Sequence, residues 1–165
     1  MGRFSIIGSA TVAGALLFAG TVHAQVADLE ISAVVEEGCL ITTDPLDFTY
    51  DPQAGAASTA QGAVNVTCTI DTLASVALDE GENAVAGSPA VPQRRASDGI
   101  ASFLAYELFQ PGGLTTVWGA GGAVEQVEHT GTGTEVALVV NGRMAAGQNV
   151  TAGTYLDTVV ATISF

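Results

Sequence analysis

The chain has 165 residues, of which 17 are acidic and only four are basic, so its formal net charge is −13. It contains no lysine and therefore offers no basic groove to a phosphate backbone or an anionic lipid surface, and we expect no nucleic-acid partner. Apolar residues make up 48% of the sequence, which disordered chains do not reach and which suffices for the core of one domain.

Residues 1–24 have the pattern of a cleaved signal peptide. Arg3 gives a positive start, residues 6–19 form an apolar stretch of 14 residues, and Val22 and Ala24 precede the expected cleavage site. A membrane-spanning helix needs about 20 apolar residues, so this stretch is too short for an anchor. We therefore expect an exported, acidic protein of 141 residues with no integral membrane segment after cleavage.

Directly after this site, residues 25–36 alternate apolar and polar side chains with the period of two that is typical of a strand. The apolar face consists of Ala27, Leu29, Ile31, Ala33 and Val35. An amphipathic strand at a terminus can complete its own sheet or insert into the sheet of another subunit. This segment is therefore the first indication of assembly.

Cys39 and Cys68 are the two cysteines of the chain. An isolated pair in an exported protein is expected to form a disulfide. The mature chain has a single histidine, His129, so we expect no zinc site. The disulfide would close a loop of about 30 residues and stabilise the fold by about 3 to 4 kcal/mol.

Further short strands are predicted along the rest of the chain, around residues 64–68, 76–78, 103–109, 136–140 and 159–165. Asn141–Gly142 is typical of a tight hairpin turn and is expected to end the fourth of them. Residues 51–62 and 81–99 are rich in turn-forming residues and are predicted to be exposed loops, with Arg94 and Arg95 as a surface pair. Short strands separated by glycine-rich turns predict an all-β fold, an antiparallel β-sandwich.

The sequence lacks the motifs that carry common enzymatic chemistry. It has no nucleophile elbow, no paired-histidine metal motif and no phosphate-binding glycine loop. The adjacent carboxylates Glu36–Glu37 and Asp79–Glu80 are typical of solvated turns, and His129 is expected in a loop. We therefore predict that the protein is not an enzyme and has no catalytic residue, no metal and no cofactor.

Six blocks, taken in order, resemble the spore coat protein U domain, which occurs in subunits of archaic chaperone-usher pili of the Csu type. The first five read GCLI, LDFTYDP, VNVTCT, LAYELF and WG, at residues 38–41, 46–52, 64–69, 104–109 and 118–119. The sixth runs from Gly142–Arg143 through Gln148 to the sequence AGTYLDTV, which ends at Val159. The resemblance covers about 130 residues, essentially the whole mature chain.

This resemblance implies that residues 37–165 form an incomplete immunoglobulin-like sandwich whose missing strand leaves an apolar groove. In such pili a periplasmic chaperone fills the groove first, and the donor strand of a neighbouring subunit replaces it at the outer-membrane usher. The resemblance makes residues 25–36 the donor strand and Cys39–Cys68 the family's disulfide. It makes 158–165 the strand that lines the groove and pairs with the chaperone, through Val159, Ala161, Ile163 and Phe165.

The implied function is that of a structural subunit of a surface pilus, exported through the periplasm and serving adhesion and biofilm formation. Two alternatives stay open at this point. A non-polymerising secreted or spore-coat surface protein would use residues 25–36 to complete its own sheet. A glycan-binding module would need an exposed aromatic platform, for which Trp118 beside Gly119–Gly122 is the candidate, although a core position is the expectation for a sole tryptophan.

Overall fold

The computed structural model describes residues 23–85, 92–122 and 124–165. The expected signal peptide, residues 1–24, therefore lies almost entirely outside the described residues. The chain divides into two units, Met1–Val34 and Val35–Phe165, and each is considered by itself. Across the described ranges, no helix has the length and apolar character needed to cross a membrane.

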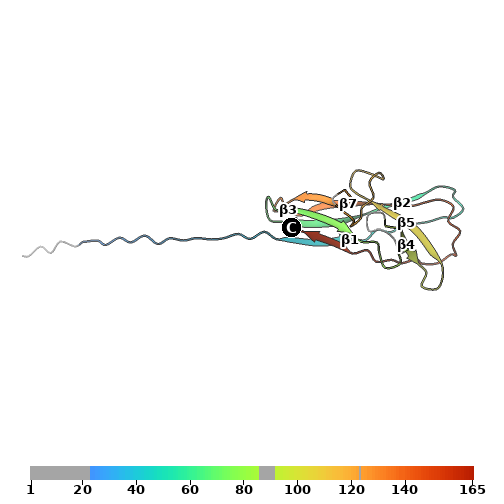
Figure 1. Ribbon diagram of the computed structural model, residues 1–165, viewed down its shortest axis with the longest axis horizontal. Coiled ribbons are helices and arrows are strands. Elements are labelled where there is room, and N and C mark those ends of the chain that lie inside the picture. The colour runs from blue at the N-terminus through green and yellow to red at the C-terminus, as the bar shows by residue number, and fades with distance from the viewer. Residues whose placement is uncertain (1–22, 86–91, 123) are drawn as a thin grey trace, which may run out of the picture. The chain divides into compact units, whose positions relative to one another are not determined.

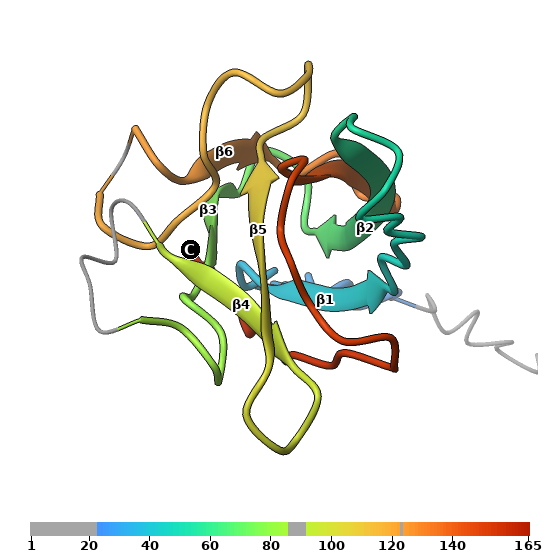
Figure 2. The same cartoon turned by 90° about the vertical axis from the view of Figure 1, so that its right-hand side faces the viewer.

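The larger unit contains two antiparallel β-sheets (Figures 1 and 2). One sheet has the strand order β1-β2-β7-β5-β4, and the other has the order β6-β3-β8. The strands are β1 (Cys39–Asp44), β2 (Ser58–Cys68), β3 (Leu73–Leu78), β4 (Arg94–Ser97), β5 (Phe103–Phe109), β6 (Val127–Thr130), β7 (Val136–Met144) and β8 (Ala161–Ser164). The predicted all-β fold is thus confirmed.

The core lies between the two sheets and is built by alternation along the strands. In β2 the side chains of Val64 and Val66 are 1% and 0% exposed, while the residue between them faces outward. The same alternation buries every second side chain in β3, β5 and the first part of β7. The buried cluster contains Val76, Leu78, Leu104, Tyr106, Leu108, Trp118, Leu138 and Val140.

Trp118 belongs to this core. Its side chain is fully buried, its indole Nε1 donates a hydrogen bond to the carbonyl oxygen of Val76 at 2.9 Å, and its amide donates to Leu108 at 2.9 Å. A buried indole with its one donor satisfied cannot serve as an exposed platform for a sugar. The observation contradicts the residue assignment on which the glycan-binding alternative rested.

The prediction that Arg94 and Arg95 form an exposed surface pair is wrong. Arg94 opens β4 and is 1% exposed; its guanidinium donates to the carbonyl oxygens of Leu78, Asp79 and Trp118. Burial lowers the pKa of Arg94. Arg95 is half-buried, with its guanidinium carbon 4.2 Å from the centre of the Phe103 ring. The predicted loop at residues 81–99 therefore contains a strand and a buried cation that ties together three carbonyl groups.

The hairpin expected at Asn141–Gly142 is also absent, because β7 continues through both residues. Asn141 lies opposite Gln61 in β2 and opposite Phe109 in β5, and Gln61 donates to its side-chain oxygen at 2.7 Å. Pairing on both sides overrides the local turn preference of the dipeptide. The other expected loop, residues 51–62, is likewise shorter, since β2 begins at Ser58.

His129 lies in β6 opposite Ala74 of β3, and the prediction that it sits in a loop is wrong. Cys39 and Cys68 face each other across the β1–β2 ladder and are joined by a disulfide, with their Cα atoms 4.1 Å apart. The bond therefore fixes the beginning of β1 to the end of β2.

Candidate functional site

The topology leaves three strand edges without a partner among the described strands, those of β1, β6 and β8. β1 pairs only with β2, and β8 pairs only with β3. These two strands belong to different sheets and approach each other to within 8 Å between Cα atoms. By contrast, the outer edge of β4 is covered, because Ser97 and Leu156 exchange two backbone hydrogen bonds of 2.9 Å. The free backbone groups of β1 and β8 are the kind of edge to which another strand can be added.

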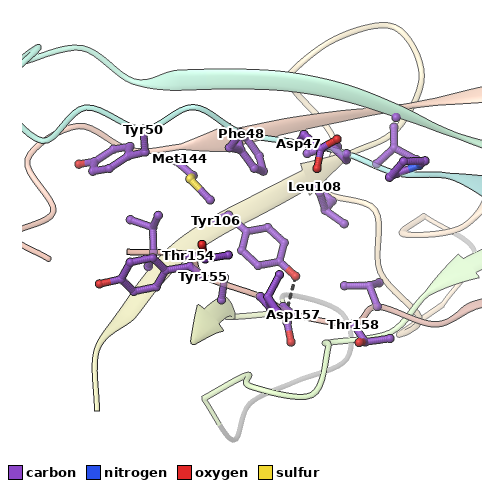
Figure 3. A pocket seen from close by; sticks show the side chains of 18 of the residues that line it. Asp47, Phe48, Tyr50, Tyr106, Leu108, Met144, Thr154, Tyr155, Asp157 and Thr158 are labelled. Carbon is purple, nitrogen blue, oxygen red and sulfur yellow. Dashed lines mark hydrogen bonds between the residues drawn. The ribbon is translucent and has the colours of Figure 1, made fainter. Parts of the chain in front are cut away.

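An apolar groove of about 980 Å³ opens beside these edges, between residues 43–52 and residues 150–161 (Figure 3). Its floor is formed by core side chains of both sheets, including Val64, Leu78, Leu104, Tyr106, Leu108, Val140 and Met144. These floor side chains are at most 8% exposed, and the groove above them lies where a complete sandwich would place a further strand.

One wall of the groove is the segment after β1, which carries Leu46, Phe48 and Tyr50. These half-buried side chains pack against the core, and the Phe48 and Tyr106 ring centres are 6.3 Å apart. Two glycines allow this close approach. A Cβ atom on Gly62 would lie 2.9 Å from the Asp44 carbonyl oxygen, and one on Gly142 would lie 2.5 Å from Cζ of Phe48.

The opposite wall is the segment that precedes β8, which Figure 2 shows running alongside β5. Gln148 holds it there, because its side-chain amide exchanges hydrogen bonds of 2.7 and 2.8 Å with the backbone of Ala105 in β5. The Tyr50 hydroxyl accepts a hydrogen bond from the backbone N–H of Gln148 at 2.8 Å and so links the two walls. Tyr155 is bound in turn to Ser102 at 2.9 Å.

One polar contact interrupts the apolar floor. The Tyr106 hydroxyl donates to Oδ2 of Asp157 at 2.6 Å (Figure 3). Oδ1 of Asp157 accepts from the backbone and side chain of Asn83 at 3.1 and 3.0 Å. Burial, together with the hydrogen bond to Asp157, raises the pKa of Tyr106 above its usual range. The phenol therefore stays protonated and keeps donating to the carboxylate.

Only some of the residues of the strand expected at 158–165 lie on the groove. Val159 and Ala161 line the groove. Ile163 is half-buried against the core opposite Val76, and Phe165 is 58% exposed. The regular strand is shorter than expected and covers Ala161–Ser164.

Sequence reasoning did not identify the two walls as such. Leu46, Phe48 and Tyr50 follow one another with the strand period of two, which is the signal that could have located the first wall. The second wall, residues 150–157, has no such period and depends on its contacts with β5 and the first wall.

The expected donor segment has no regular structure: residues 23–38 form no strand. Its large apolar side chains are exposed, with Leu29, Ile31 and Val35 at 85%, 87% and 81%. Ala27 and Ala33 of the same face are exposed as well. Alternating apolar side chains in this state are available to a partner strand.

No arrangement of three or more His, Cys, Asp or Glu side chains that could hold a metal ion occurs within the described ranges. The groove combines apolar side chains along its floor with unpaired backbone groups of β1 and β8 along its edges, which is the chemistry that strand addition uses. An antiparallel sandwich with such a groove defines a β-domain open to strand addition.

Comparison with known proteins places the chain in a family. The family model of the Spore Coat Protein U domain matches residues 25–162, and the chain belongs to this family. It is 36% identical to Protein U of Myxococcus xanthus over 124 residues, which cover 71% of this chain and 69% of that protein.

A solved structure shares the fold. It is a chain in the chaperone–tip adhesion subunit pre-assembly complex of the archaic chaperone-usher Csu pili of Acinetobacter baumannii, with a TM-score of 0.58 and 23% identity. The match covers 79% of this chain and 40% of that chain, so this protein spans less than half of the solved chain's length. The immunoglobulin-like β fold predicted from the sequence is thereby confirmed.

Proposed function

We propose that the protein is a structural subunit of a surface pilus, joined to its neighbours by donor-strand complementation. In this proposal residues 25–36 of one subunit insert into the groove of the next. The observation that carries it is the pairing, in one chain, of an apolar groove between two free strand edges with an exposed segment of strand-like alternation.

The length and the apolar face of residues 25–36 suit an added strand. Twelve extended residues span about 40 Å, the length of a long strand in a sandwich. Burial of Leu29, Ile31 and Val35 would contribute about 1.5 to 3 kcal/mol for each side chain, as an upper estimate. Backbone hydrogen bonds to β1 and β8 would add to this, so the joint needs no covalent bond.

Strand direction distinguishes a donor from a second copy from self-insertion. β1 and β8 run in opposite directions, because β1 is antiparallel to β2, the short turn after β2 reverses the chain into β3, and β8 is antiparallel to β3. Residues 25–36 are separated from β1 by Glu37 and Gly38, so a self-inserted segment would reverse there and run parallel to β8. A donated strand can instead run antiparallel to β8 and parallel to β1, so the two insertions differ in which edge forms the antiparallel ladder.

A periplasmic chaperone and an outer-membrane usher complete the proposal. An open apolar groove would aggregate during export unless a partner covered it. The chaperone would pair with the free edge of β8, beside Val159 and Ala161, and the donor strand would replace it at the usher. The likeness in fold to a subunit from a chaperone pre-assembly complex supports this order. Cleavage of residues 1–24 would begin the route to the cell surface, where the pilus would serve adhesion and biofilm formation.

Thermal unfolding tests the proposal. An oxidised domain of residues 37–165 is heated with and without a synthetic peptide of residues 25–36, and a peptide carrying Leu29→Asp and Ile31→Asp is the matched control. We expect a large rise in Tm with the native peptide alone, because ligand binding stabilises the folded state. A domain that is stable alone and ignores both peptides would instead be a complete, non-polymerising surface protein.

A further inference from the structure

The donor segment and the groove that would receive it carry charge of the same sign. Residues 25–36 contain three acidic residues, Asp28, Glu30 and Glu36, and no basic side chain. The residues that line the groove include Asp44, Asp47 and Asp157 and no basic residue. Binding surfaces usually show the opposite arrangement, in which a positive patch meets a negative one.

The arginines of the domain do not compensate for this repulsion, because each has partners elsewhere. Residues 37–165 contain 14 acidic residues against three arginines. Arg94 is buried on backbone carbonyls, and Arg95 stacks on Phe103 and donates to the Asn83 carbonyl at 3.0 Å. Arg143 forms an ion pair with Glu107 at 2.6 Å.

The geometry separates this repulsion from the contacts that would hold the donor strand. Because side chains alternate along a strand, Asp28 and Glu30 would point to solvent when Leu29 and Ile31 point into the groove. Asp44 and Asp47 are exposed on the groove rim. The apolar contacts act only after docking, whereas the charges act at a distance, so the repulsion slows the encounter more than it weakens the finished joint.

We infer that the ionic strength of the surroundings controls how fast subunits join, with assembly slow at low salt and fast at high salt. This inference rests on the proposed donor-strand function. Mobile ions shorten the range of the repulsion, from a Debye length of about 30 Å at 0.01 M to about 8 Å at 0.15 M. The salt dependence is thus opposite to that of electrostatically steered partners, whose association slows as salt is added.

Polymerisation of the mature chain, residues 25–165, tests the inference. Its rate is followed by light scattering, and donor-strand joints are counted as oligomers that persist on unheated denaturing gels. We expect the rate to rise about tenfold between about 0.01 M and about 0.5 M NaCl. A rate that is constant or falls with salt would overturn the inference and leave the proposed function intact.

Two double variants with the same change in charge locate the effect. Asp28→Asn with Glu30→Gln neutralises the donor segment and should polymerise faster at low salt, with a shallower salt dependence. Glu128→Gln with Glu135→Gln neutralises two exposed side chains outside the groove lining and should keep most of the salt dependence. This pair also controls for the strengthening of apolar contacts by salt.

Equal salt dependence in the two double variants would overturn the inference that the repulsion acts locally between the donor segment and the groove. The absence of persistent oligomers at every salt concentration, in a chain that circular dichroism shows to be folded, would overturn the proposed function and this inference with it.

Discussion

Residues 25–36 and strand β2 have the same alternating pattern and very different surroundings. In β2, Val64 and Val66 are almost completely buried, and the strand is paired with β1 on one side and β7 on the other. In residues 25–36, Leu29 and Ile31 are more than four-fifths exposed and belong to no strand. Alternation thus occurs both in a paired strand and in a segment that belongs to no strand, so the pattern alone does not determine whether a segment pairs within the chain.

The largest difference between the two regions is expected when an apolar side chain in each is replaced by aspartate. Val66→Asp places a carboxylate in the core and should cost at least about 4 kcal/mol, so that the domain no longer folds. Ile31→Asp should change the free energy of unfolding by less than about 0.5 kcal/mol and yet prevent polymerisation. Urea unfolding and unheated gels measure the two effects. Equal loss of stability in both variants would contradict the comparison.

The disulfide marks where the exposed segment gives way to the folded domain. Replacing Cys39 and Cys68 together by alanine should lower the free energy of unfolding by about 3 kcal/mol, because the unfolded chain gains conformational freedom. Urea unfolding under oxidising conditions measures the loss. A reducing agent should destabilise the wild-type protein by a similar amount and leave the double variant unchanged, which provides the control.

Two glycines distinguish the paired strand β7 from the open wall of the groove. Gly142→Ala would bring its Cβ to 2.5 Å from Phe48 Cζ, so Phe48 must shift, and we expect a loss of about 1 to 3 kcal/mol. Gly153→Ala is the matched control, since its Cβ would meet nothing within 4 Å, and it should change stability by less than about 0.5 kcal/mol. Thermal or urea unfolding compares them, and equal effects would contradict the packing of Phe48 against β7.

The smallest expected effect concerns the one polar contact in the groove floor. Tyr106→Phe removes the hydrogen bond to Asp157 and should cost about 1 kcal/mol at neutral pH. The folded protein raises the pKa of Tyr106, so its contribution to stability is complete below the unfolded pKa of about 10 and is lost as the pH rises further. Urea unfolding near neutrality and above about pH 10 should therefore show a shallower alkaline loss in the variant than in the wild type. Identical alkaline losses would indicate that Tyr106 ionises normally.

The sequence predicts those parts of the fold that depend on periodicity. The period of two located residues 64–68 in a buried strand, and a continuous apolar run located residues 103–109 in another. Two cysteines in a chain expected to be exported indicated the disulfide that joins Cys39 to Cys68. These signals are local or combinatorial, so they do not require knowledge of which strands become neighbours.

Other features depend on tertiary contacts and could not be predicted in this way. Arg94 is buried because three carbonyl groups from two separate segments converge on it, those of the neighbours Leu78 and Asp79 and that of Trp118. Asn141 lies inside a strand because its side chain bridges Gln61 and the carbonyl of Gln110, at 2.7 and 3.1 Å. The groove lies where no described strand fills the space between β1 and β8, and only the family resemblance indicated it.

The position of the disulfide bears on how a filament would respond to mechanical tension. In a chain of subunits linked by donor strands, a pulling force enters each domain at the residue that follows the donor segment, close to Cys39. The covalent bond passes that load directly from β1 to the end of β2, which is anchored between β1 and β7. The hydrogen bonds of β1 would therefore not have to resist peeling one by one, and the weakest element under load would be the non-covalent joint between subunits.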